Sequence, residues 1–162
     1  MGAPDLFCAM LLAASAGHKV LGHQRLAPIA ARLSGSGAAL GPVLLLLAGA
    51  AEMAAAVFLL IAPLRVIGAA LAAAIWAGYA LLLWRQRGQT LDCGCDLAAR
   101  AKPVTAALVA RPAGLAALAL AVSTLPAAPF TLDAPFAAAG FLALYLGLSD
   151  LLATPRPAWR TA

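Results

Sequence analysis

The chain has 162 residues, of which 64% are apolar and 10% are charged, and its formal net charge is +5. A soluble domain carries about 25% charged residues and uses them to cover its surface, so a soluble fold is excluded. A disordered chain is poor in apolar residues, which excludes disorder as well. The mean hydropathy of +0.95 instead predicts an integral membrane protein with the lipid bilayer as its main partner.

Long apolar runs predict the helices. A helix needs about 20 residues to cross the hydrocarbon core. We therefore expect an all-α bundle of about five transmembrane helices in a single domain over 1–162, with spans at 6–22, 43–62, 65–84, 103–127 and 134–153. The first run is the weakest because His18 and Lys19 lie near its end. A signal peptide there is disfavoured, since residues 1–5 contain no Lys or Arg.

The basic residues predict the orientation. Arg65 lies on one side of the expected bundle and Arg111 lies inside a helix, while the other basic residues fall on the opposite side: Lys19, Arg25, Arg32, Arg85, Arg87, Arg100, Lys102, Arg156 and Arg160. The positive-inside rule then places the N-terminus outside, and the C-terminus and the polar loop 85–102 in the cytoplasm. Basic residues dispersed between apolar runs do not form a nucleic-acid-binding groove, so no nucleic acid partner is expected.

Glu52 and Arg111 fall well inside predicted spans, away from the span ends. Glu52 lies roughly 13 Å below the membrane surface, and Arg111, counted from Pro103, lies roughly 12 Å deep. A buried carboxylate is protonated or paired. We therefore predict a Glu52–Arg111 ion pair, with Lys19 or His18 as possible further partners reaching in from the first helix.

Two alternatives to this pair stay open. In the first, Glu52 is a neutral acid bonded to a backbone carbonyl, and Arg111 extends to the cytoplasmic interface. In the second, the helix breaks at Arg111–Pro112, which leaves 97–110 as an amphipathic segment at the interface.

Two cysteines lie in the loop 85–102, in the run Asp92-Cys93-Gly94-Cys95-Asp96. A disulfide closed over one residue is strained and therefore labile, which predicts a redox pair at Cys93 and Cys95. The same thiolates suit a soft metal such as Cu or Zn, and inert thiols are the third interpretation. A four-ligand zinc site is disfavoured because only Cys8, His18 and His23 remain. Cys8 is expected to be a small buried apolar residue.

The order of these features resembles the methylamine-utilisation protein MauE family, a branch of the DoxX-like membrane protein superfamily, over about residues 5–125. The resemblance rests on Gly17-His18-Lys19-Val20, Ala51-Glu52-Met53, Cys93-Gly94-Cys95, Lys102-Pro103-Val104-Thr105 and Arg111. The sequence departs from the family pattern at Asp96-Leu97, where Phe-Gly is frequent, and at Pro112, where Asn is common. The implied fold is a four-helix core with one C-terminal helix.

The resemblance implies a role in thiol-redox or disulfide maturation, or processing, of a periplasmic client such as the small subunit of methylamine dehydrogenase. It also implies a thioredoxin-like partner and a bacterial inner membrane. The client folds outside, whereas the basic residues place Cys93 and Cys95 inside. Either electrons cross the membrane, or the topology is inverted, or the loop dips into the bilayer.

Two other functions remain open. One is a transporter or soft-metal-handling protein, with the Cys93-Gly94-Cys95 loop at its mouth and Glu52 in its path. The other is a membrane scaffold subunit without chemistry. The sequence contains no P-loop, Rossmann, GxSxG or HExxH motif, so no hydrolase, kinase or dehydrogenase is expected. Any enzymatic role would be that of a thiol-disulfide oxidoreductase.

Overall fold

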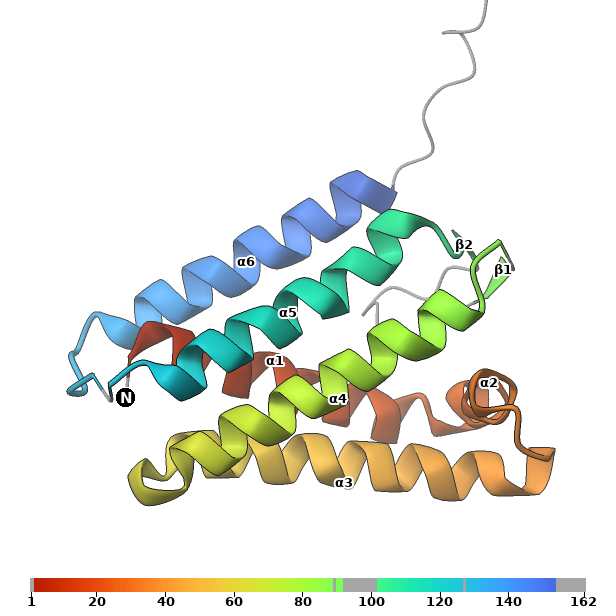
Figure 1. Cartoon of the computed structure of the whole chain (residues 1–162), viewed down its shortest axis with the longest axis horizontal. Coiled ribbons are helices and arrows are strands. Elements are labelled where there is room, and N and C mark those ends of the chain that lie inside the picture. Colours follow the sequence, from red (N-terminus) through yellow and green to blue (C-terminus); the bar gives the residue numbers. More distant parts are fainter. Residues whose placement is uncertain (1, 89, 92–101, 127, 154–162) are drawn as a thin grey trace, which may run out of the picture.

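The computed structural model describes residues 2–88, 90–91, 102–126 and 128–153, and this part of the chain is mainly helical (Figure 1). Its helices are α1 (Ala3–Leu21), α2 (His23–Ser34), α3 (Gly41–Leu60), α4 (Arg65–Arg85), α5 (Ala106–Thr124) and α6 (Ala134–Ala153). The single turns η1 (Ala38–Leu40) and η2 (Ala62–Leu64) precede α3 and α4. Two short strands, β1 (Thr90–Leu91) and β2 (Lys102–Pro103), pair antiparallel.

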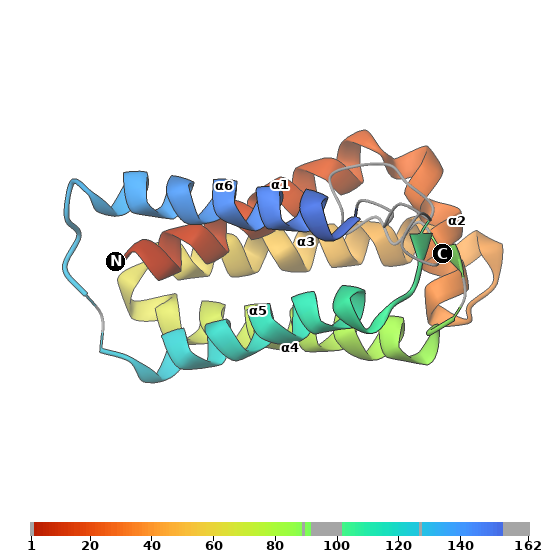
Figure 2. The ribbon, with the colours of Figure 1, turned by 90° about the horizontal axis from the view of Figure 1, so that it is seen from above.

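The helices α1, α3, α4, α5 and α6 run alongside one another, while α2 lies across one end of this bundle (Figures 1 and 2). We call this the α2 end, which also contains η1, β1, β2, the last turn of α4 and the first turn of α5. The opposite end, the η2 end, contains Gly2, η2 and the connection from α5 to α6. The predicted loop 18–42 and the described ends of the predicted loop 85–102 therefore lie at the same end of the bundle, as the basic residues indicated.

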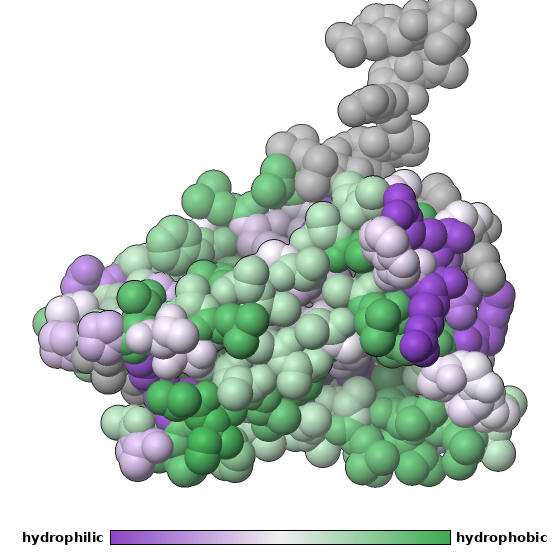
Figure 3. Space-filling model, in the orientation of Figure 1, coloured by the Kyte–Doolittle hydropathy of each residue, from purple (hydrophilic) through white to green (hydrophobic). Residues whose placement is uncertain are grey.

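Three segments are long and apolar enough to cross a membrane: Ala38–Leu60, Ala62–Arg85 and Ala106–Thr124. α1 and α2 meet that criterion only together, as a pair bent by 106°, and the described part of α6 gives a shorter apolar helix, Ala134–Ser149. Apolar residues cover much of the outer face (Figure 3). The chain is therefore an all-α, multi-pass membrane protein, and the count of five spans stays a prediction.

Two segments differ from the sequence-based expectation. The connection 18–42 contains α2, whose apolar residues Leu26, Ile29 and Leu33 recur at helical spacing. The predicted span 103–127 corresponds to α5. This helix begins at Ala106 rather than at Pro103, because the Thr105 hydroxyl accepts a hydrogen bond from the backbone N–H of Leu108 (3.4 Å). α5 is continuous through Pro112, so the break considered at Arg111–Pro112 is absent.

Small residues allow the helices to approach closely. Ala55, Ala69 and Ala72 are fully buried in the main core. A Cβ atom placed on Gly68 would lie 2.5 Å from the backbone nitrogen of Leu59, so α3 and α4 touch backbone to backbone. Trp76 is buried in the same core.

Candidate functional site

A buried ion pair joins α1 to α3. The Lys19 ammonium lies 2.8 Å from Oε1 and 2.9 Å from Oε2 of Glu52. Only 8% of Lys19 and 1% of Glu52 are exposed. In a low-dielectric interior, each charge offsets the high desolvation cost of the other.

Two hydroxyl groups form hydrogen bonds with this ion pair. The Ser15 hydroxyl accepts a hydrogen bond from Lys19 (2.8 Å) and donates one to Oε1 of Glu52 (3.0 Å). The Tyr79 hydroxyl of α4 donates to the same oxygen at 2.8 Å. The Lys19 nitrogen also lies 5.2 Å from the centre of the Tyr79 ring. Ser15, Lys19, Glu52 and Tyr79 form what we call the polar cluster, which ties α1, α3 and α4 together.

The ion partner of Glu52 is therefore Lys19, the further partner considered from the sequence, and not Arg111. The Arg111 guanidinium donates to the backbone carbonyl of Ser149 in α6. His18 does not join the cluster either, since its Nε2 lies 3.4 Å from the Arg25 guanidinium. Equal depth in the membrane indicates proximity along the bundle axis, but it does not specify which face of a helix a side chain occupies.

Sequence reasoning missed Ser15 and the role of Tyr79. Ser15 stands four residues before Lys19, and this spacing places the two side chains on one helix face. That spacing, with a hydroxyl in an otherwise apolar run, was the available signal. Tyr79 carried no such signal, because a tyrosine in a span is equally compatible with packing or with an interfacial position.

Three cavities surround the polar cluster. One of about 880 Å³ lies between α1, α2 and α3 and reaches Lys19. A second of about 200 Å³ lies between α2, α3 and α4 and reaches both Lys19 and Tyr79. A third of about 50 Å³ is lined by Ser15, Tyr79 and Arg111. Arg111 and the cluster thus share one small cavity, although the structure gives no ion pair between Arg111 and Glu52.

The predicted redox residues Cys93 and Cys95 lie outside the described residues. The residues that flank their segment on both sides, 90–91 and 102–103, are described. Thr90 pairs with Pro103, and Leu91 pairs with Lys102. Before β1, Gly88 adopts a φ of 84°, and its N–H donates to the Val104 carbonyl at 3.3 Å. The segment 92–101 therefore begins and ends at one point, between the end of α4 and the start of α5.

The other candidate ligands are dispersed. Cys8 is a free cysteine with no exposed surface, which confirms its interpretation as a small buried residue. His23 is exposed, and its Nδ1 lies 3.1 Å from the Val20 carbonyl oxygen. Within the described part of the chain, no three His, Cys, Asp or Glu side chains gather at a site that could hold a metal ion.

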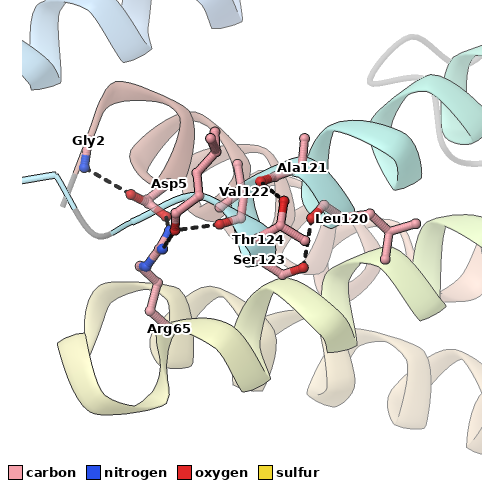
Figure 4. A network of polar contacts seen from close by, with 9 residues as sticks. Gly2, Asp5, Arg65, Leu120, Ala121, Val122, Ser123 and Thr124 are labelled. Atoms are coloured by element: carbon pink, nitrogen blue, oxygen red, sulfur yellow. Dashed lines mark hydrogen bonds and ion pairs between the residues drawn. The ribbon is translucent and has the colours of Figure 1, made fainter.

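A second buried ion pair lies at the η2 end (Figure 4). Nη1 of Arg65, the first residue of α4, lies 3.1 Å from Oδ1 of Asp5 in α1 and donates to the Val122 carbonyl at 2.9 Å. The guanidinium also donates to the Leu125 carbonyl, while Asp5 accepts from the Gly2 N–H at 2.9 Å. Arg65 thus caps the carbonyl end of α5. It is a buried, paired residue and not the free loop charge expected from the sequence.

Residues 3–126 match the family model described as methylamine utilisation protein MauE. No curated protein and no solved structure matches the chain significantly. The matched region runs from the start of α1 to just beyond α5, and so includes the polar cluster, the Asp5–Arg65 pair and the two loop cysteines. The chain belongs to the methylamine-utilisation protein MauE family.

Proposed function

We propose that this chain is a membrane factor in which Cys93 and Cys95 exchange a disulfide with a partner protein during maturation of an exported client. The observation that carries the proposal is the pairing of the two chain segments that flank residues 92–101, which we call the cysteine segment. The β1–β2 pairing and the bond from Gly88 to Val104 fix both ends of the segment 92–101 on the α4–α5 helix pair. In this proposal, the two thiols separated by one glycine act at the α2 end of the bundle.

The exchange needs no reactant besides the partner. A thiolate of Cys93 or Cys95 attacks a disulfide sulfur of the partner, and one partner cysteine leaves as a thiolate. The second thiol, after losing its proton, then attacks the mixed disulfide and releases the partner as a dithiol. Cys93 and Cys95 lose two electrons and two protons in total, and the partner gains both. The reverse sequence transfers the disulfide to the partner.

In this proposal, the polar cluster has a structural role: it holds together the helices that support the cysteine segment. Tyr79 lies about 9 Å along α4 from Arg85, where the helix ends. Its bond to Glu52 and the Lys19–Glu52 pair hold α1, α3 and α4 in fixed register below the loop. In this proposal, Arg111 fixes α5 against α6 through the Ser149 carbonyl. The partner is a thioredoxin-like protein or the client itself.

The redox state of the thiols in intact cells tests the proposal. We use the full chain with Cys8→Ala, so that a maleimide mass tag reports only on Cys93 and Cys95. A fraction of molecules should resist tagging until reductant is added. Cys93→Ser and Cys95→Ser should each accumulate a mixed disulfide that reductant dissolves, whereas the Cys8→Ala control should accumulate little.

Complete tagging under all growth conditions, with no mixed disulfide in either single variant, would contradict the proposal. If the purified chain instead retains copper or zinc stoichiometrically, and Cys93→Ser with Cys95→Ser abolishes that retention, the loop is a soft-metal site.

A further inference from the structure

The orientation of α2 is unusual for this bundle. α1 and α2 meet at Gly22 with a bend of 106°, and α2 lies across the bundle end (Figure 2). Because α1 runs along the bundle axis, α2 lies close to the plane of the membrane. A Cβ atom on Gly41 would lie 2.2 Å from the Ala27 carbonyl oxygen, so the backbone of α2 rests directly on the first turn of α3.

The surface beside the bend is mainly apolar. Val20 and Leu21, the last two residues of α1, are 69% and 89% exposed. Next to them lies the cavity of about 880 Å³ between α1, α2 and α3, which is lined mainly by apolar residues such as Pro28, Leu45 and Met53, and also by Lys19, His23 and Gln24. Exposed leucine and valine beside a mainly apolar groove are unfavourable in water and favourable in hydrocarbon. This groove therefore borders the acyl chains.

The remaining surface of α2 is basic. The helix contains His23, Arg25 and Arg32 and no acidic residue. Arg32 is exposed. Glu52 is the sole acidic residue between positions 18 and 91, and it is buried against Lys19. An amphipathic helix with cationic residues above an apolar face binds anionic membrane surfaces.

We propose that α2 is an interfacial helix that binds anionic phospholipid. Arg25 and Arg32 contact the phosphate groups, and the acyl chains occupy the groove between α1, α2 and α3. The bound lipid keeps the α2 end, and with it the β1–β2 ladder, at the membrane surface. This site is independent of the thiol exchange proposed above.

Lipid retention tests the charge requirement. The full-length protein is reconstituted in vesicles of phosphatidylcholine with phosphatidylglycerol and extracted in mild detergent, and its retained lipid is measured by native mass spectrometry. Phosphatidylglycerol should be enriched over phosphatidylcholine. Arg25→Gln with Arg32→Gln should reduce the affinity for phosphatidylglycerol about five-fold or more, because each basic group contributes at the surface.

The matched control is Arg85→Gln with Arg87→Gln, which removes the same charge from the same end but not from α2. It should retain most of the enrichment. An equal loss in both double variants, or no enrichment in the wild type, would overturn the proposal.

The placement of α2 has its own measurement, which reports label accessibility rather than lipid retention. Nitroxide labels are attached to Leu21→Cys and Arg32→Cys, in a chain carrying Cys8→Ala, Cys93→Ser and Cys95→Ser. The label at position 21 should be more accessible to oxygen than to an aqueous nickel complex, and the label at position 32 should show the reverse. A water-accessible label at position 21 in the folded protein would exclude the interfacial position.

Discussion

Lys19 and Arg65 are buried cations, whereas Arg111 is only partly buried, and the partners of the three differ. Lys19 and Arg65 each pair with a carboxylate of another helix, whereas Arg111 donates to a backbone carbonyl. An ammonium group is a compact charge with three donors, and Lys19 uses them on both oxygens of Glu52 and on Ser15. The guanidinium of Arg65 instead spans Asp5 and the free carbonyls at the end of α5.

A double-mutant cycle tests which cation belongs to Glu52. Removing one member of a buried pair costs about 3–5 kcal/mol, because the other charge is left uncompensated. We therefore expect Lys19→Met and Glu52→Gln each to lower the unfolding temperature of the purified protein. Their combination should be less destabilised than the sum, with a coupling of about 1–3 kcal/mol.

Arg111→Gln combined with Glu52→Gln is the matched comparison and should be nearly additive. A stronger coupling of Glu52 to Arg111 than to Lys19 would contradict the arrangement described here.

At this scale, the sequence predicted that Glu52 needs a partner but did not specify which one. The cost of an isolated carboxylate in lipid follows from the residue type and its depth. The identity of the partner depends on the rotation of α1, α3 and α5 about their own axes. Those rotations are set by packing among many alanines, and a run that is apolar all round shows no preferred face.

The elements differ in how far they could be predicted. α3 and α4 follow from their apolar runs within a few residues of the expected bounds. α2 was missed because its polar residues lower the hydropathy of the segment, although its apolar residues keep helical spacing and Gly35, with a φ of 70°, ends the helix. The start of α5 at Ala106 depends on the Thr105 cap, a local hydrogen bond that hydropathy does not report.

The backbone contact between α3 and α4 predicts which glycine substitution in α4 lowers stability. Gly68→Ala should lower the unfolding temperature markedly, because the new methyl group would lie 2.5 Å from the Leu59 nitrogen and 2.8 Å from the Phe58 carbonyl carbon. These are backbone atoms that cannot move aside without separating the helices. Overpacking of this kind costs about 1–3 kcal/mol.

Gly78→Ala is the control in the same helix, since a Cβ atom there meets nothing within 4 Å. It should leave the unfolding temperature unchanged or raise it slightly, because alanine favours the helix. Equal effects of the two substitutions would show that α3 and α4 do not touch at Gly68.

For the molecule as a whole, the two ion pairs change which basic residues count toward its orientation in the membrane. Lys19 and Arg65 were counted among the loop charges, but both are buried and neutralised by carboxylates. Of the described side chains, the basic residues that remain outside the bundle interior are Arg25, Arg32, Arg85 and Arg87, all at the α2 end. This asymmetry predicts that the α2 end faces the cytoplasm and the N-terminus lies outside.

Cysteine accessibility tests this orientation. Pro63→Cys, in the exposed turn η2, should react with a membrane-impermeant maleimide in intact cells, provided that Cys8, Cys93 and Cys95 are first replaced. Ser36→Cys, at the α2 end, should react only after the cells are permeabilised. Thr131→Cys, in the connection from α5 to α6, should behave like Pro63→Cys. The reverse pattern would place Cys93 and Cys95 on the same side as an exported client.

Both ion pairs begin in α1, and this has a consequence for biosynthesis. Asp5 and Lys19 are synthesised first, and each lacks a counter-charge until a later helix emerges from the ribosome. Glu52 arrives with α3, Arg65 and Tyr79 arrive with α4, and none of these residues needs α5 or α6 for its ion pair. The buried charges of the first three long helices can therefore neutralise one another before the cysteine segment is synthesised.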